Sequence, residues 1–212
     1  MVKEYRTIFD MGTDEIVEKK SRFIGYIAHV ESEEEADAFV LGIKKKHYDA
    51  RHNCYAYVIG ESQQKLRFSD DGEPGGTAGK PILEVITGLG LVDVCIVVTR
   101  YFGGTLLGTG GLLRAYTQAA QKCVEATEII NKQLVIPVNI VTNYNDLGKI
   151  QYLLGTEKIP VTESDYGEEV KLTVAVPYDD YDRLEKQLIE ITAAKVTLEK
   201  NEAVFAVVKH AY

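Results

Sequence analysis

The stretch Val92-Asp93-Val94-Cys95-Ile96-Val97-Val98-Thr99 runs directly into a glycine-rich segment, Arg100-Tyr101-Phe102-Gly103-Gly104-Thr105-Leu106-Leu107-Gly108-Thr109-Gly110-Gly111-Leu112-Leu113-Arg114-Ala115-Tyr116. A nearly continuous apolar run over 92–99 fits a central strand. After the glycines, apolar residues recur at helical spacing, which predicts a helix over about 110–126. The sequence therefore predicts a buried strand, a glycine-rich bend and a packed helix in succession.

This bend is a candidate binding site. Glycine permits positive φ and close approach of a partner to the backbone. A helix start carries free N–H donors and partial positive charge, which favour anions. Arg100 and Arg114 flank it, and Tyr101 and Phe102 offer rings for stacking. The candidate residues here are Arg100, Tyr101, Phe102, Gly103, Gly104, Gly108, Gly110, Gly111 and Arg114.

A purely architectural bend is the alternative, but five glycines between 103 and 111 exceed what one turn needs. The spacing matches neither a Walker loop nor Gly-x-Gly-x-x-Gly.

Working outward, the preceding chain alternates strands and helices. Residues 15–30 read as two strands broken near Lys19–Ser21. Ser32 and Glu35 have capping-box spacing, which predicts a helix over 33–47. Strands are expected at 52–59 and 65–69, and a helix at about 80–88 with Pro81 in its first turn.

A polar loop, 70–79, separates the second of those strands from the helix. Asp70, Asp71 and Glu73 have oxygen ligands suited to Mg²⁺, although Asp-Gly is also an ordinary turn signal. We favour a loop without metal that caps or gates the 100–116 surface. Thr77-Ala78-Gly79-Lys80 opens the next helix, a second possible anion site. The candidate residues here are Asp71, Glu73, Gly76, Thr77 and Gly79.

Arg51 and His52 are further candidates for ligand or nucleic-acid binding. His52 and Cys54 share one face of their strand, which is a geometry for a Cys–His nucleophile pair. No third orienting group is evident, so we favour a histidine packed against a small cysteine. No catalytic residue and no metal ligand are assigned.

From 133 onward the pattern restarts in the order β-α-β-β-α-β, a ferredoxin-like split unit with no catalytic constellation. Its first strand, 133–141, is expected to break at Pro137. Helices are predicted at 143–154 and 178–192, strands at 160–165 and 169–176, and one or two strands within 194–208. The domains are therefore predicted at 1–132 and 133–212.

Composition narrows the class of protein. The net charge is −8, which disfavours wholesale coating of nucleic acid but not a local patch. Residues 1–132 carry 16 basic and 19 acidic residues, against 8 and 13 in 133–212. Three widely spaced cysteines argue against a disulfide framework. No long apolar run or signal-peptide core is present, so we expect a cytoplasmic protein without membrane contact or cofactor.

Four motifs together resemble the YigZ/IMPACT family, in its bacterial two-domain form. They are Ser21-Arg22-Phe23-Ile24-Gly25; His52-x-Cys54-x-Ala56; Asp70-Asp71-Gly72-Glu73-Pro74-x-Gly76-Thr77-Ala78-Gly79-x-Pro81; and Arg100-Tyr101-Phe102-Gly103-Gly104 through Arg114-Ala115-Tyr116. The resemblance covers most of 15–126 and is most specific in the last motif.

The resemblance implies an α+β N-terminal domain like the second domain of a small-subunit ribosomal protein, a fold shared with domain four of elongation factor G. It implies a C-terminal domain similar to the ferredoxin-like fifth domain of that factor. Eukaryotic relatives regulate translation through an extra N-terminal domain that this sequence lacks, whereas some enzymes of the same superfamily are small-metabolite kinases.

Three functions stay open. The favoured one is a non-enzymatic protein that binds RNA or the ribosome and regulates translation, with a protein partner in the translation machinery. The second is an enzyme acting on a phosphorylated small molecule or nucleotide held at the glycine-rich helix start. The third is a protein-interaction adaptor.

Overall fold

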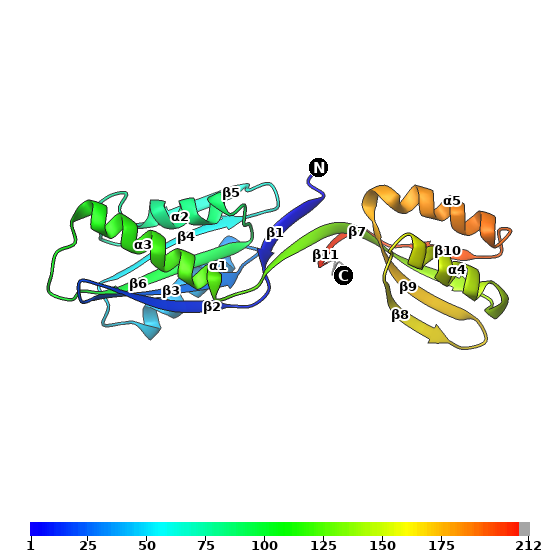
Figure 1. Ribbon diagram of the computed structural model, residues 1–212, viewed down its shortest axis with the longest axis horizontal. Helices are drawn as coiled ribbons and strands as arrows, with labels where there is room; N and C mark the ends of the chain where they lie inside the picture. Colours follow the sequence, from blue (N-terminus) through cyan, green and yellow to red (C-terminus); the bar gives the residue numbers. More distant parts are fainter. Residues whose placement is uncertain (208–212) are drawn as a thin grey trace. The chain divides into compact units, whose positions relative to one another are not determined.

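The computed structural model describes residues 1–207, which divide into two compact units (Figure 1). One unit holds Glu4–Asn131 with Val2, and the other holds Met1, Lys3 and the described residues from Lys132 onward. Each unit contains an antiparallel sheet with helices packed on it, so the protein is α+β.

The N-terminal sheet has the strand order β2-β3-β6-β4-β5, with every pairing antiparallel. The strands are β2 (Gly12–Glu18), β3 (Ser21–His29), β4 (His52–Ile59), β5 (Lys65–Ser69) and β6 (Val94–Tyr101). The predicted apolar strand β6 lies at the centre, between β3 and β4. Because both of its faces are covered there, nearly all of its residues are buried, as its apolar sequence predicts.

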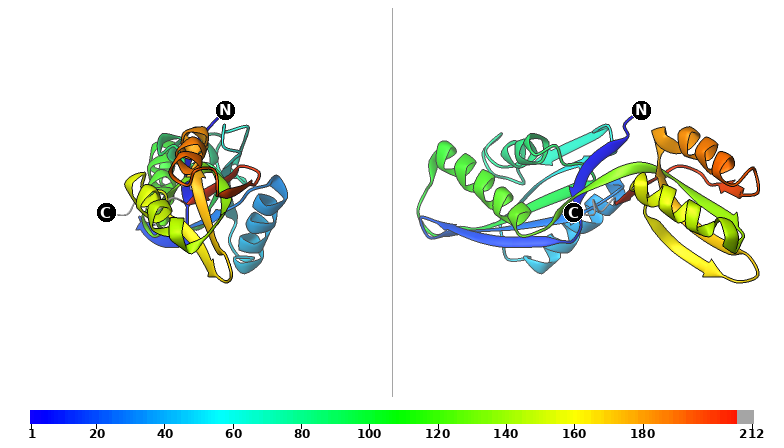
Figure 2. Two further views of the ribbon diagram at one scale, coloured as in Figure 1. Left: turned by 90° about the vertical axis from the view of Figure 1, so that its right-hand side faces the viewer. Right: turned by 45° about the vertical axis from the view of Figure 1, so that its right-hand side comes forward.

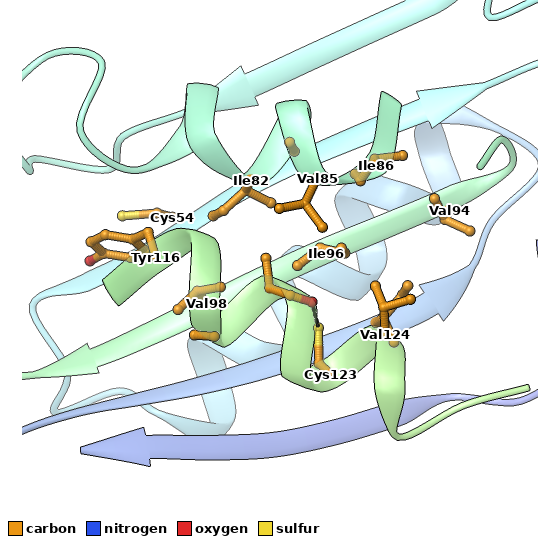
Figure 3. Packing of buried hydrophobic residues seen from close by; sticks show 14 of the residues in the cluster. Cys54, Ile82, Val85, Ile86, Val94, Ile96, Val98, Tyr116, Cys123 and Val124 are labelled. Atoms are coloured by element: carbon orange, nitrogen blue, oxygen red, sulfur yellow. Dashed lines mark hydrogen bonds between the residues drawn. The ribbon is translucent and has the colours of Figure 1, made fainter. Parts of the chain in front are cut away.

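Helices cover both faces of this sheet, with α1 (Glu33–Lys46) opposite α2 (Gly79–Gly88) and α3 (Gly108–Glu125) (Figure 2). Alternate residues of β6 therefore enter different cores: Ile96 and Val98 pack with α2 and α3, and Cys95 and Val97 pack with α1. Figure 3 shows the first of these cores, where Tyr116 of α3 lies beside Cys54 of β4.

Helix α1 begins as its sequence predicts. Ser32 has extended backbone geometry, and its hydroxyl accepts from the Glu35 N–H at 3.2 Å. The Glu35 carboxylate reaches back to the Glu31 N–H at 2.8 Å. Acids fill the first turn and Lys44, Lys45 and Lys46 fill the last, so both ends suit the helix dipole.

The C-terminal unit follows the predicted order β-α-β-β-α-β, with the last strand in two pieces. Its elements are β7 (Ile129–Thr142), α4 (Tyr144–Thr156), β8 (Val161–Tyr166), β9 (Val170–Pro177), the 3₁₀ turn η1 (Tyr178–Asp180), α5 (Tyr181–Ile191), β10 (Thr197–Lys200) and β11 (Val204–Val207). Both β10 and β11 pair with β7. Val208, the last residue of the predicted 194–208 segment, lies outside the described residues.

Three local predictions were wrong. Strand β1 (Glu4–Ile8) was not predicted, although buried Ile8 joins the core. Strand β7 does not break at Pro137, which pairs with Ala175 on one side. On the other side Pro137 faces the gap between β10 and β11, where its missing N–H costs no ladder bond and its carbonyl accepts from the Asn201 N–H at 3.0 Å. Helix α3 begins at Gly108, two residues before the expected start.

Within residues 1–207, no helix combines the length and the apolar character needed to cross a lipid bilayer.

Candidate nucleic-acid interface

The candidate site lies where three strands and a helix end together. The start of β3 and the end of β6 are aligned by the pair Arg22–Tyr101, and the start of β4 meets β6 at His52–Arg100. The last turn of α1 joins them, because His47 Nδ1 lies 2.9 Å from the Tyr101 hydroxyl. Antiparallel order thus gathers residues from distant parts of the sequence, and we call this region the basic end.

Arg100 lies inside the basic end and is held by an internal network. Its guanidinium is 2.7 Å from the Glu73 carboxylate, and both side chains are almost fully buried. Tyr116 of α3 donates to the same carboxylate oxygen at 2.8 Å. Phe23 and Phe102 lie against the guanidinium. Arg100 and Glu73 therefore fasten the 70–79 loop to β6 and α3, and the Arg100 charge is neutralised there.

The Asp70 carboxylate gives the 70–79 loop its shape. It accepts from the backbone N–H groups of Gly76 at 2.9 Å, Ala78 at 3.0 Å and Gly79 at 2.8 Å. The N-terminus of α2, which the sequence offered as a second anion site, is therefore occupied by a carboxylate of the chain itself. Thr77 also serves the loop, since its hydroxyl donates to the Pro74 carbonyl at 2.6 Å.

Asp71 ties the loop to the rest of the basic end. One oxygen meets the Lys44 ammonium at 2.6 Å, and the other accepts from the Asn53 N–H at 2.7 Å. The three loop carboxylates thus have separate protein partners. Within residues 1–207 there is also no group of three or more acids, histidines or cysteines arranged to hold a metal ion.

A surface pocket of about 430 Å³ opens at the basic end. Its lining residues are Asp49, Ala50, Arg51, His52, Arg100, Tyr101 and Phe102. Five of these are residues that the sequence marked as candidates from two separate motifs, 51–52 and 100–102. The structure therefore brings those two motifs into one pocket, of a size typical for a small ligand or part of a larger one.

His52 has a fixed orientation in this pocket. Its Nδ1 lies 2.9 Å from the Asp71 carbonyl oxygen. A carbonyl oxygen only accepts, so Nδ1 carries the proton, and Nε2 is the acceptor nitrogen of that tautomer. Cys54 does not pair with it: the Cys54 thiol contacts the Asp70 carbonyl at 3.0 Å, and burial raises its pKa. A buried neutral thiol is a poor nucleophile.

The glycine-rich segment forms the outer edge of the basic end, between β6 and α3 (Figure 1). Gly103 fits closely, since a Cβ there would lie 2.0 Å from the Lys20 carbonyl carbon. Gly104 and Gly108 have φ of +83° and +70° in open space. Gly110 lies in the exposed first turn of α3, which has no side-chain cap and no acid, and Gly111 packs on Leu107. These N–H groups therefore have no side-chain acceptor from the cap position.

Arg114 differs from Arg100 in its surroundings. It lies in the second turn of α3, is exposed, and has no ionic partner within residues 1–207. Of the two arginines expected to flank the bend, Arg114 is the one whose charge is available to a ligand.

Several basic residues of this end were not among the sequence candidates. Within residues 1–207, six exposed side chains there lack an ionic partner: Lys19, Lys20, Lys45, Lys46, Arg51 and Arg114. Lys19 and Lys20 form the β2–β3 turn against Gly103. Lys45 and Lys46 end α1. The sequence shows the pair Lys19–Lys20 and the run 44–46. It does not show that they lie at the same end of the sheet, because that depends on the strand register.

Exposed aromatic rings lie among these cations. Tyr48 is 88% exposed directly after α1, and Phe102 is 54% exposed in the pocket. Beneath them, His47 bridges the hydroxyls of Tyr26 and Tyr101 at 2.7 and 2.9 Å. Burial and the neighbouring Lys46 lower the His47 pKa, so a neutral ring supports this network. Cations interleaved with rings are typical of single-strand nucleic-acid surfaces.

The fold and site define a two-unit α+β protein with a basic, aromatic loop cluster at one end of its first sheet. Residues 19–124 match the Impact N-terminal domain, and residues 140–195 match a domain of unknown function (DUF1949). The chain belongs to the IMPACT family.

Two bacterial relatives are similar over most of the chain. The IMPACT family member YvyE of Bacillus subtilis is 38% identical over 97% of this chain and 94% of its own length. The family member YigZ of Escherichia coli is 44% identical over 75% and 79%. A crystal structure described as that of a hypothetical protein matches 95% of this chain and 99% of its own, with 37% identity and a TM-score of 0.62.

Proposed function

We propose that this protein is a non-enzymatic RNA- or ribosome-binding member of its family that acts in translation, in the cytoplasm. The observation that carries the proposal is the basic end, where six exposed cations have no ionic partner among residues 1–207 and two aromatic rings are exposed. Free ammonium and guanidinium groups attract phosphates, and exposed rings stack on bases. The family's association with translation regulation supports the same direction.

The architecture gives further support. The strand order β8-β9-β7-β10, with all pairings antiparallel, agrees with a ferredoxin-like C-terminal domain. We propose that the N-terminal domain has the fold of domain four of elongation factor G. Two domains of translation-factor type in one chain favour the ribosome as the partner.

A small-molecule enzyme has less support. The one observation in its favour is His52, whose Nε2 edge is available in a pocket of about 430 Å³. The acid–base partners that the sequence offered are otherwise engaged, since Asp70 caps α2 and Asp71 pairs with Lys44. A general base alone does not define a reaction.

The test is binding of the full chain to ribosomes and to single-stranded RNA, measured by cosedimentation and by fluorescence anisotropy. The variant Lys46→Ala with Arg51→Ala removes two cations of the basic end that have no ionic partner within residues 1–207. We expect it to weaken binding severalfold. The matched control, Lys171→Ala with Lys186→Ala, removes two exposed lysines of the C-terminal unit and should bind like the wild type. Equal loss in both variants, or no binding by the wild type, contradicts the proposal.

A further inference from the structure

The pocket at the basic end contains three kinds of group that meet different parts of one nucleotide. Phe102 is 54% exposed and gives a ring face for a base. Arg51 is exposed and has no ionic partner within residues 1–207, so it suits a phosphate. His52 adds a directed acceptor. A nucleotide unstacked from its neighbours presents a base face, a phosphate and a sugar edge together.

The Nε2 acceptor of His52 indicates which kind of ligand the pocket selects. Its Nδ1 edge faces the 70–79 loop through the bond to the Asp71 carbonyl, and Asp71 is itself held by Lys44 and by the Asn53 N–H. The Nδ1 contact therefore fixes the ring, which lines the pocket, and Nε2 is the ring nitrogen that remains for a ligand. Nε2 has no partner within residues 1–207. A lone pair in this position favours a ligand that brings a hydrogen-bond donor.

The ribose 2′-hydroxyl distinguishes RNA from DNA, because it is the one hydrogen-bond donor on a sugar inside an RNA strand and DNA lacks it. We propose that His52 is the residue with which this protein selects RNA over DNA, an inference that rests on the proposed function. The base of one unpaired nucleotide stacks on Phe102, its phosphate meets Arg51, and its 2′-hydroxyl donates to His52 Nε2.

Phe102 itself is held in place for this role. The Arg100 guanidinium lies 5.6 Å from the centre of the Phe102 ring, and Arg100 is fixed by its ion pair with Glu73. Ser21 also accepts from the Gly103 N–H at 3.1 Å, directly after the ring. The stacking platform and the acceptor are thus both anchored through the 70–79 loop, by Glu73 and by Asp71.

The test uses three oligouridylates of about ten nucleotides, a length that spans a single-strand site. They carry 2′-hydroxyl, 2′-deoxy or 2′-fluoro sugars. All three oligomers carry uracil, so the N3–H donor of the base is the same in each and does not affect the comparison. The 2′-fluoro sugar keeps the ribose pucker without the donor. Affinities are measured by fluorescence anisotropy on the full chain.

We expect the wild type to bind the ribose oligomer about threefold to tenfold more tightly than either analogue, as one neutral hydrogen bond provides. His52→Phe should reduce this ratio to about one, because the ribose oligomer alone loses the hydrogen bond to Nε2. Phe102→Leu should weaken all three oligomers alike. Thermal melting of each variant verifies that it is folded.

Equal affinity of the wild type for the three oligomers overturns the inference and leaves the proposed function standing. A preference for ribose that survives His52→Phe also overturns it. If the wild type binds none of the oligomers and no ribosomes, the proposed function falls as well.

Discussion

Arg100 and Glu73 form the buried ion pair on which the basic end depends. Each side chain is less than a tenth exposed, and Tyr116 adds a hydrogen bond to the same carboxylate. Burying two charges costs desolvation energy that their attraction only partly offsets. The pair therefore matters less as net stabilisation than as a constraint, because neither residue can be removed without leaving the other charge buried alone.

Glu73→Ala should consequently be strongly destabilising. We expect it to lower the free energy of unfolding by about 3–5 kcal/mol, measured by denaturant titration. Replacing both partners, Glu73→Leu with Arg100→Met, should recover most of this loss. Glu15→Gln, which breaks the exposed Arg22–Glu15 pair, should change stability little. A mild effect of Glu73→Ala would show that the pair is not buried as described.

The three cysteines provide a second prediction at this scale. Burial raises the pKa of the Cys123 thiol to about 12, and burial raises the pKa of the Cys54 and Cys95 thiols as well. All three thiols are thus neutral at pH 7–8 and shielded from reagents.

In the native protein none of them should react with a disulfide reagent such as Ellman's within minutes. All three should react after unfolding in denaturant. Rapid titration of Cys54 in the folded protein would instead favour the nucleophile hypothesis for His52 and Cys54.

Among the elements, the 70–79 loop and helix α2 depend on one side chain. Asp70 accepts the N–H groups of Gly76 in the loop and of Ala78 and Gly79 at the start of α2, where the cap residue Ala78 itself makes no side-chain hydrogen bond. Its carboxylate also favours the positive end of the helix dipole.

Asp70→Ala should therefore lower the free energy of unfolding by about 1–2 kcal/mol, the upper range for loss of a cap. Asp70→Asn, which keeps one acceptor oxygen, should lose less. Thermal or denaturant unfolding of both variants measures the difference. Equal stability of Asp70→Ala and the wild type would contradict the capping role.

Local signals predicted most of the elements. The capping box placed α1, the apolar run placed β6 at the sheet centre, and β4 and β5 have the bounds that the sequence predicted. Strand β1 was missed because its residues mix charge with apolar side chains and only its last two residues, Thr7 and Ile8, are strongly buried. Pro137 misled the prediction of β7, since a proline that faces a gap between two neighbouring strands does not end its own strand.

At the scale of the whole molecule, the charge is distributed unevenly. The chain carries −8 overall, yet cations with no ionic partner in the described part of the chain gather where β3 and β4 begin and β6 and α1 end. The sequence alone could not show this, because Lys20, Lys46 and Arg51 come to the same end of the sheet through strand register. It also could not show that Arg100 is neutralised, because Glu73 reaches it across a loop.

The salt dependence of RNA binding tests the central claim most directly. The logarithm of the binding constant should fall linearly with the logarithm of salt concentration, because phosphate contacts release counterions. The variant Lys46→Ala with Arg51→Ala should have a slope shallower by about 1.4, or roughly 0.7 per lost phosphate contact on a single strand. A variant slope equal to the wild-type slope would contradict the assignment of the basic end as the RNA-binding surface.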